Sequence, residues 1–138
     1  EQDSGAAVWR KENYHYFYNK NVLQSGNKSS AELEGLRIFK DDKIIRKTRH
    51  SAFIKTNFER LLRKNKIDLL ILAGVFIDGC VGLTAIDGYE RDFKVILAKD
   101  AVFGTGLNES ISMLNFLRKE FEISKLSNSK IFNLIRNN

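Results

Sequence analysis

One segment constrains the fold more than any other. It is the apolar run over residues 69–77, which is followed at once by Asp78, Gly79 and Cys80. A short run rich in β-branched residues is typical of a parallel strand that is covered on both faces. Residues 80–89 then predict a helix. Such a strand needs neighbours on both faces, so the chain must build a sheet with helices packed against it.

Strand and helix patterns alternate along the chain from Ser30 onward. The apolar spacing predicts helices over residues 57–64, 80–89 and 109–121, and a last helix that Ser127 caps and that runs to Ile135. Short β-prone or apolar runs predict strands over residues 43–47, 69–77, 93–97 and 123–126. Residues 1–30 are polar and aromatic-rich and predict a long loop. The alternation indicates an α/β fold with a parallel sheet.

Length, charge and cysteine content limit the classes of function. The 138 residues correspond to one domain. The net charge is +6, but the basic residues are spread out and match no nucleic-acid-binding motif. We therefore expect a solvated basic surface and no nucleic-acid partner. No apolar run reaches the ~18 residues of a membrane span, so we expect no membrane partner. A single cysteine, Cys80, fits a reducing compartment, and we expect a cytoplasmic location.

Cys80 is the candidate for chemistry, because the active sites of open α/β sheets lie where strands end and helices begin. A thiol in the first turn of a helix lies at the positive end of the helix dipole, which favours the thiolate form. Backbone N–H groups of the same turn can bind a developing oxyanion. A lone cysteine is also commonly a small buried hydrophobic residue. Position alone leaves both roles open.

A second group of motifs resembles a known family. Residues 44–53 read Ile-Ile-Arg-Lys-Thr-Arg-His-Ser-Ala-Phe, with Lys47 at the end of a short predicted strand. Together with residues 74–81, 84–95 and 99–101, they resemble the isochorismatase-like cysteine hydrolase superfamily, from about residue 1 to residue 133. The Lys-x-Arg-x-Ser-Ala-Phe motif is closer to the isochorismatase branch than to the nicotinamidases. The resemblance implies a three-layer α/β/α fold with a doubly wound parallel sheet.

The resemblance also implies catalytic roles. Cys80 matches the family's nucleophile. Lys47 matches its catalytic lysine, which would hold the charge of the thiolate or of the attacked group. On its own, Lys47 is better explained as a solvated strand end, but its pairing with Cys80 favours the catalytic role. The Val75–Phe76 peptide matches a non-proline cis bond of the family. With Gly79, this bond would orient backbone N–H groups into an oxyanion hole.

Four further residues are expected to line a substrate pocket. Arg49 would clamp a carboxylate through its bidentate geometry, with a surface salt bridge as the alternative. His50 stands where isochorismatase-like sequences often have Tyr, and it either lines the pocket or fills the turn. Phe53 and Trp9 would wall the pocket, although core packing is the commoner role of such residues. The sequence lacks the Asp-x-His cluster with which some relatives bind a metal, so we expect no metal and no cofactor.

No residue matches the catalytic aspartate of the family, since Asp3, Asp78 and Asp87 lie in the wrong places. We therefore expect residues 1–138 to be a single isochorismatase-like domain that lacks the family's first two strands. The predicted function is hydrolysis of a small-molecule substrate. Either Cys80 attacks an amide-like C–N bond, or the vinyl ether of isochorismate is hydrolysed. The alternative is a catalytically incomplete remnant that serves as a binding or scaffold domain. Relatives commonly pair, so a homodimer is expected.

Overall fold

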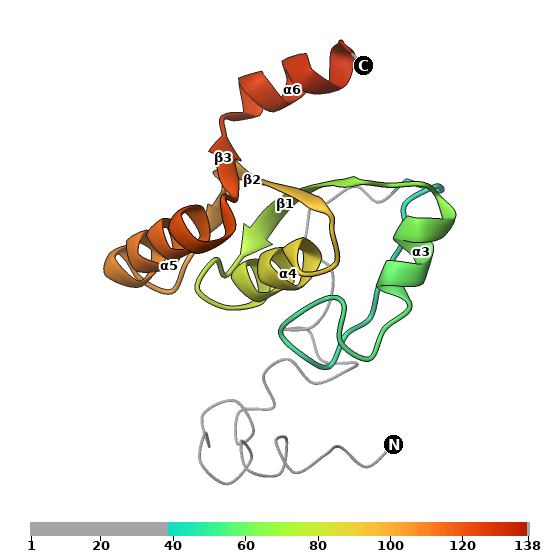
Figure 1. Cartoon of the computed structure of the whole chain (residues 1–138), viewed down its shortest axis with the longest axis horizontal. Coiled ribbons are helices and arrows are strands. Elements are labelled where there is room, and N and C mark those ends of the chain that lie inside the picture. The colour runs from blue at the N-terminus through green and yellow to red at the C-terminus, as the bar shows by residue number, and fades with distance from the viewer. Residues whose placement is uncertain (1–38, 138) are drawn as a thin grey trace, which may run out of the picture. The chain divides into compact units, whose positions relative to one another are not determined.

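The structure of the protein is a computed structural model that describes residues 39–137 (Figure 1). The chain divides into two compact units, residues 1–42 and residues 43–138, and the fold below is that of the second unit. The predicted N-terminal loop and Trp9 lie outside the described residues.

Three parallel strands form the sheet, in the order β1-β2-β3. The chain passes from α3 to β1, α4, β2, α5, β3 and α6, so strands and helices alternate as predicted. The bounds of the elements are α3 Phe58–Lys64, β1 Leu69–Val75, α4 Cys80–Tyr89, β2 Lys94–Phe103, α5 Leu107–Phe121, β3 Ser124–Leu126 and α6 Asn128–Arg136.

Strand β2 is longer than the sequence predicts, because it continues beyond Leu97 after an irregularity. Leu72 of β1 pairs with Leu97, but Gly74 pairs with Val102. Two steps along β1 therefore match five steps along β2, and β2 carries three extra residues at this point. These residues include the exposed pair Lys99 and Asp100, which interrupts the apolar pattern that predicts the strand. The carboxyl end of β2 is thereby brought level with the end of β1.

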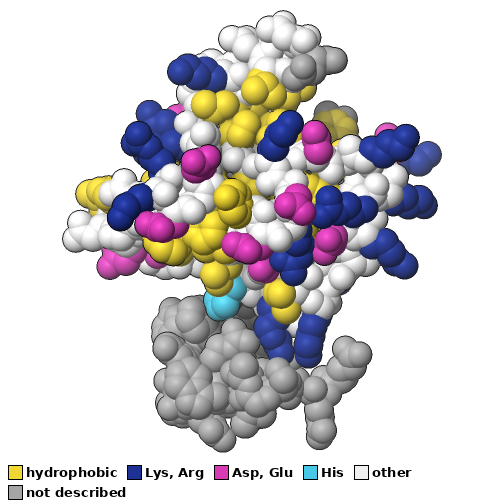
Figure 2. Space-filling view, in the orientation of Figure 1, with side chains coloured by type: hydrophobic (Ala, Val, Ile, Leu, Met, Phe, Trp, Pro, Cys, Tyr) yellow, Lys and Arg dark blue, Asp and Glu magenta, His cyan; other side chains and the backbone are white. Residues whose placement is uncertain are grey.

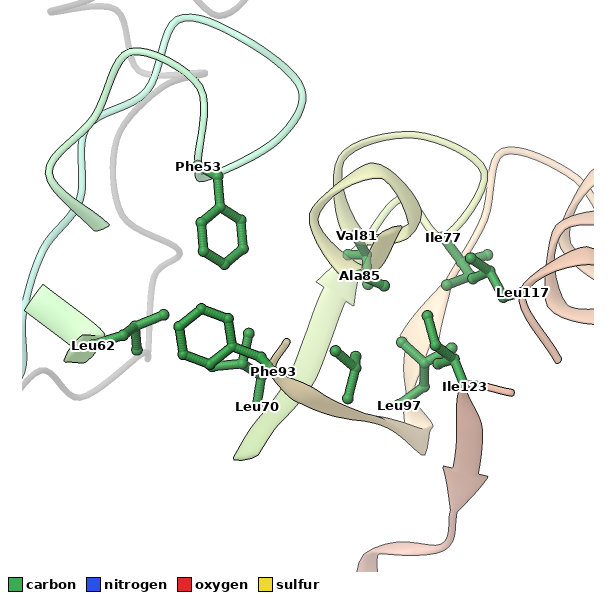
Figure 3. Packing of buried hydrophobic residues seen from close by; sticks show 11 residues of the cluster. Phe53, Leu62, Leu70, Ile77, Val81, Ala85, Phe93, Leu97, Leu117 and Ile123 are labelled. Atoms are coloured by element: carbon green, nitrogen blue, oxygen red, sulfur yellow. The ribbon is translucent and has the colours of Figure 1, made fainter. Parts of the chain in front are cut away.

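Helix α4 packs against both β1 and β2, and α5 contacts α4. Val81 and Ala85 are the residues by which α4 enters the core, and both are buried. Figure 3 shows them beside Ile77 and Leu117, with Leu97 and Ile123 completing this part of the core. The apolar strand and the inward face of α4 thus fix the point at which Cys80 begins the helix.

A second part of the core joins the segment before α3 to the beginning of the sheet. Leu62, Leu70 and Phe93 pack there with Phe53 (Figure 3). Arg91 bridges the two sides, because its Nε lies 3.1 Å from Glu59 Oε2 of α3. This contact ties α3 to the turn that follows α4.

Two expectations about strands are wrong. Residues 43–47 form no strand with any other described segment, since a strand exists only through backbone pairing and this segment pairs with none of β1 to β3. Strand β1 is not covered on both faces either. Only Leu70 is fully buried, and Val75 is 56% exposed, because β1 is an edge of the sheet that residues 39–137 form.

The surface carries charges of both signs. Figure 2 shows Lys and Arg side chains on both sides of the visible face, interspersed with Asp and Glu. None of the helices within residues 39–137 is long and apolar enough to cross a membrane.

The close approach of α4 to the turn before it can be tested at Gly82. A Cβ at this position would collide with the carbonyl oxygen of Ile77. Overpacking of this kind costs about 1–3 kcal/mol, whereas the better helix propensity of Ala returns up to about 1 kcal/mol. We expect Gly82→Ala to lower the free energy of unfolding by about 1–2 kcal/mol, measured by urea denaturation. The control is Leu83→Ala, at an exposed position of the same helix, which should change it by less than about 0.5 kcal/mol. Equal stability of Gly82→Ala and the parent chain would contradict this packing.

Candidate active site

Cys80 is the first residue of α4 and lies at the carboxyl end of β1, where the sequence predicts it. Its side chain is half-buried. The turn before it is held by the Phe76 carbonyl, which accepts hydrogen bonds from the N–H groups of Gly79 and Val81, each at 3.0 Å. The Ile77 N–H donates to the Phe103 carbonyl at 2.9 Å, which fastens the turn to the end of β2. The thiol therefore stands on a fixed strand-to-helix junction.

The Val75–Phe76 peptide is cis, as the resemblance implies. Both side chains are largely exposed and lie at the rim of the junction. The N–H of Gly79, which the resemblance assigns to an oxyanion hole, is engaged with the Phe76 carbonyl in this structure. It serves the turn here rather than facing the space around the thiol.

Asp78 joins this junction to the loop that follows β2. Its Oδ1 accepts a hydrogen bond from the Thr105 N–H at 3.0 Å, and its Oδ2 accepts one from the Thr105 hydroxyl. These bonds, that of the hydroxyl first, hold the pKa of Asp78 below its ordinary value of 3.8. Gly104 leaves room for this arrangement, because a Cβ there would lie 2.9 Å from Asp78 Oδ1. The two carboxyl ends of the parallel strands are thus connected directly beside Cys80.

His50 is the side chain that the structure brings to the thiol. The Nδ1 atom of His50 lies 3.6 Å from Cys80 Sγ, although the two residues are thirty positions apart in the sequence. His50 is exposed, and Cys80 is half-buried. The structure thus shows the imidazole beside the thiol, while both alternatives for His50, lining a substrate pocket or filling the turn, stay predictions.

Thr84 holds the segment that carries His50 against helix α4. The Thr84 hydroxyl accepts a hydrogen bond from the Ala52 N–H at 3.1 Å and donates one to the Cys80 carbonyl at 2.7 Å. Thr84 is buried, at 7% exposed. Thr84 is not among the site residues predicted from the sequence. The available signal was its position four residues after Cys80, which puts a polar side chain on the same helix face as the thiol.

Lys47 and Arg49 belong to the same segment. The Lys47 ammonium donates to the Arg49 carbonyl at 2.9 Å, and Arg49 Nη1 donates to the Thr48 carbonyl at 3.0 Å. Within residues 39–137, Lys47 forms no hydrogen bond or ion pair with Cys80. The structure therefore brings His50 to the thiol, while the catalytic role of Lys47 and the carboxylate clamp at Arg49 stay predictions.

Phe53 requires a correction. Its ring lies in the core instead of walling a pocket, with 7% of the residue exposed and ring centroids 5.0 Å from Phe58 and 5.8 Å from Phe93. The physical reason is that the Ser-Ala-Phe turn faces the apolar end of the sheet, where burying an aromatic ring is favourable. Trp9, the other expected wall residue, lies outside the described residues.

Two other features of the described part bear on the site. No three His, Cys, Asp or Glu side chains among residues 39–137 are grouped so that they could hold a metal ion. A hollow of about 580 Å³ lies at the other end of α4, lined in part by Tyr89, Lys94 and Phe121. Since α4 begins at Cys80 and ends at Tyr89, this hollow is not the space around the thiol.

The link through Thr84 yields a stability test. Thr84→Val keeps the shape of the side chain but removes the hydroxyl, which leaves the Ala52 N–H and the Cys80 carbonyl without this partner. We expect a loss of about 1–3 kcal/mol in the free energy of unfolding, measured by urea denaturation. The control, Thr84→Ser, retains the hydroxyl and should lose less. If the valine and serine variants are equally stable, the two hydrogen bonds contribute nothing.

The Asp78–Thr105 contact predicts a pH dependence. Because the folded-state pKa of Asp78 lies below its ordinary value, its stabilising effect is present above about pH 4 and is lost as the pH falls through the folded-state value. We expect Asp78→Asn to be less stable than the parent chain at pH 6, and the difference to shrink steadily as the pH falls below about 4. Urea denaturation over this pH range measures it, with Asp92→Asn, a change at an exposed carboxylate, as the control. A difference that stays constant from pH 6 to pH 3 would contradict the contact.

The chain is similar to a known family model and to several curated proteins. The isochorismatase domain model matches residues 6–123. An uncharacterized isochorismatase family protein, PncA of Bacillus subtilis, is 48% identical over 56 residues, which are 41% of this chain and 31% of that protein. The ureidoacrylate amidohydrolase RutB of Methylorubrum extorquens is 31% identical over 88 residues, which are 64% of this chain and 36% of that protein. The chain thus spans about a third of the length of these curated relatives.

The fold is also similar to that of solved isochorismatase-like proteins. The crystal structure of an isochorismatase-like hydrolase from Alkaliphilus metalliredigens matches with a TM-score of 0.72 at 28% sequence identity, over 79% of this chain and 60% of that one. This likeness, with the parallel sheet and its flanking helices, confirms the predicted three-layer α/β/α fold. On the match of the domain model to most of its length, the chain belongs to the isochorismatase family.

Proposed function

We propose that Cys80 is the nucleophile of a hydrolase that cleaves an amide-like C–N bond in a small molecule. The observation that carries this proposal is the position of the thiol. It is half-buried, it is the first residue of α4, and it lies at the carboxyl end of a parallel strand. Open α/β sheets bind their ligands at this edge, and a helix N-terminus favours the thiolate, which is the reactive form.

The reaction follows from the chemistry of a thiolate. The sulfur attacks the carbonyl carbon and forms a C–S bond, and the charge moves to the carbonyl oxygen. Collapse of this intermediate breaks the C–N bond, and the nitrogen leaves as an amine or ammonia after it gains a proton. Water then attacks the thioester, the C–S bond breaks and the acid is released. Lys47 is assigned to the stabilisation of the anionic species, because its segment is the one that Thr84 holds against α4 beside the thiol.

One of the reported relatives supports the amide class. RutB is named as an amidohydrolase. Hydrolysis of the vinyl ether of isochorismate, the other reaction expected from the sequence, depends on proton donation and needs no thiol, so an accessible Cys80 favours cleavage of a C–N bond. A binding or scaffold domain receives no support from the relatives, since RutB and the structural neighbour are both named as hydrolases.

The proposal is tested by turnover of small primary amides and carbamoyl compounds. Release of ammonia is measured for the full chain and for Cys80→Ala, which removes the nucleophile and should lower the rate at least about a thousandfold. Mass spectrometry of the quenched reaction should find an acyl group on the peptide that contains Cys80. The control is Ser112→Ala, an exposed position on α5, which should leave the rate unchanged.

Two results would contradict this assignment. One is amide turnover that Cys80→Ala leaves intact. The other is hydrolysis of isochorismate by both proteins at equal rates, which would favour the vinyl-ether reaction.

A further inference from the structure

We propose that His50 is the acid–base partner of Cys80. It takes the thiol proton on Nδ1 and returns it to the leaving nitrogen. This inference rests on the proposed function of Cys80 and adds a residue to it, one that the resemblance does not identify as catalytic. The observation is the approach of two reactive side chains from separate segments, with 3.6 Å between Cys80 Sγ and His50 Nδ1.

The distance suits proton transfer. Sulfur is larger than oxygen or nitrogen, so a separation of 3.6 Å lies within hydrogen-bonding range of a thiol. Catalytic hydrogen bonds are often longer before substrate is bound. The donor and acceptor roles depend on which nitrogen of the imidazole carries the proton, and the proposal requires the neutral ring to accept at Nδ1.

The surrounding contacts fix the pair. His50 precedes the buried residue Ser51, whose hydroxyl accepts a hydrogen bond from the Phe53 N–H at 3.2 Å. The Ala52 N–H, two residues after His50, is bonded to Thr84, and Thr84 is bonded in turn to the carbonyl of Cys80 itself. The backbone that carries the imidazole is thus connected by two hydrogen bonds to the residue that carries the thiol. Such positioning is what general acid–base catalysis needs.

Histidine also has the right acidity for both halves of the reaction. An imidazole changes its protonation state near neutral pH, whereas the phenol of the Tyr that often stands at this position in similar sequences ionises near pH 10. Helix α4 adds to the effect, because its N-terminal dipole stabilises the thiolate that proton transfer creates. Thiolate and imidazolium then attract each other, and each stabilises the charged form of the other.

The proton balance closes with water as the only co-reactant. The thiol proton moves to His50 Nδ1 as the C–S bond forms, and the imidazolium gives it to the nitrogen as the C–N bond breaks. In the second half, His50 takes a proton from the attacking water as the new C–O bond forms, and the imidazolium returns this proton to the sulfur when the C–S bond breaks.

Three charged side chains flank the pair along the chain. Lys47 and Arg49 lie on the segment of His50, and Asp78 lies in the turn before Cys80, where its carboxylate is bonded to Thr105. Cations favour a thiolate and a carboxylate opposes it, so a comparison that changes only the imidazole is needed to identify its share.

The test is the rate at which iodoacetamide alkylates Cys80, measured against pH on the full chain. His50→Gln removes the titrating ring at an exposed position. We expect it to slow alkylation about tenfold near pH 6.5, since an opposite charge at this distance is worth about one pH unit. The two rates should converge above about pH 9, where a free thiol ionises unaided. The control is Ser112→Ala, at an exposed position of α5, which should leave the curve unchanged. Identical curves for His50→Gln and the parent chain would overturn the proposal.

A second measurement observes the imidazole itself. In an NMR titration of the His50 ring, Cys80→Ala should lower the titration midpoint by about one pH unit, whereas Ser112→Ala should leave it in place. A midpoint of His50 that ignores the loss of the thiol would also overturn the pair. The outcome is separable from the proposed function. Amide turnover with uncoupled titrations rejects His50 alone, while coupled titrations without amide turnover reject the reaction and leave the pair standing.

Discussion

The hydroxyl of Thr84 is the contact on which the arrangement of the site depends. It is one small polar group in a buried position, and it accepts from one segment while donating to another. Both of its partners are backbone groups, at Ala52 and Cys80, so the bonds constrain the course of the chain and not merely the side chains. A buried hydroxyl that is satisfied on both sides is favourable only in one geometry. This is why a half-buried thiol on a helix and an exposed imidazole on a loop lie together.

The part of the fold that depends on local pattern was predictable from the sequence. The apolar run before Cys80 and the spacing of Val81 and Ala85 are enough to place a strand, a turn and a helix in the right order, and the structure confirms them. Pairing is not a local property. Residues 43–47 have the composition of a strand but no partner among the described strands, and β1 has an apolar sequence although its last three residues are exposed. Amino-acid composition indicates the strand propensity of a segment, but whether the segment forms a strand depends on a neighbouring strand with which it can pair.

The same distinction holds for the site. Cys80 could be identified because a glycine-flanked strand-to-helix turn is visible in the sequence, and the cis peptide before it followed from the resemblance. The proximity of His50 to the thiol could not be identified, since it depends on hydrogen bonds that cross thirty residues of chain. Phe53 was expected to line a pocket, but its ring is buried in the core. Three residues after His50, the chain turns from the surface into the core, and a change of direction within one turn carries no signal in the residue types.

The irregularity in β2 lies between two parts of the strand that have different partners. The residues before it, around Ile96 to Ala98, pair with β3 and determine where the sheet continues. The residues after it pair with the end of β1 and lead into Thr105, which Asp78 holds. Asp100, between the two halves, accepts a hydrogen bond from the Asn128 N–H at the start of α6. The start of α6 is therefore anchored at the point where β2 passes from one pairing partner to the other. A single strand thus connects the C-terminal helix, the continuation of the sheet and the loop that Asp78 holds beside the thiol.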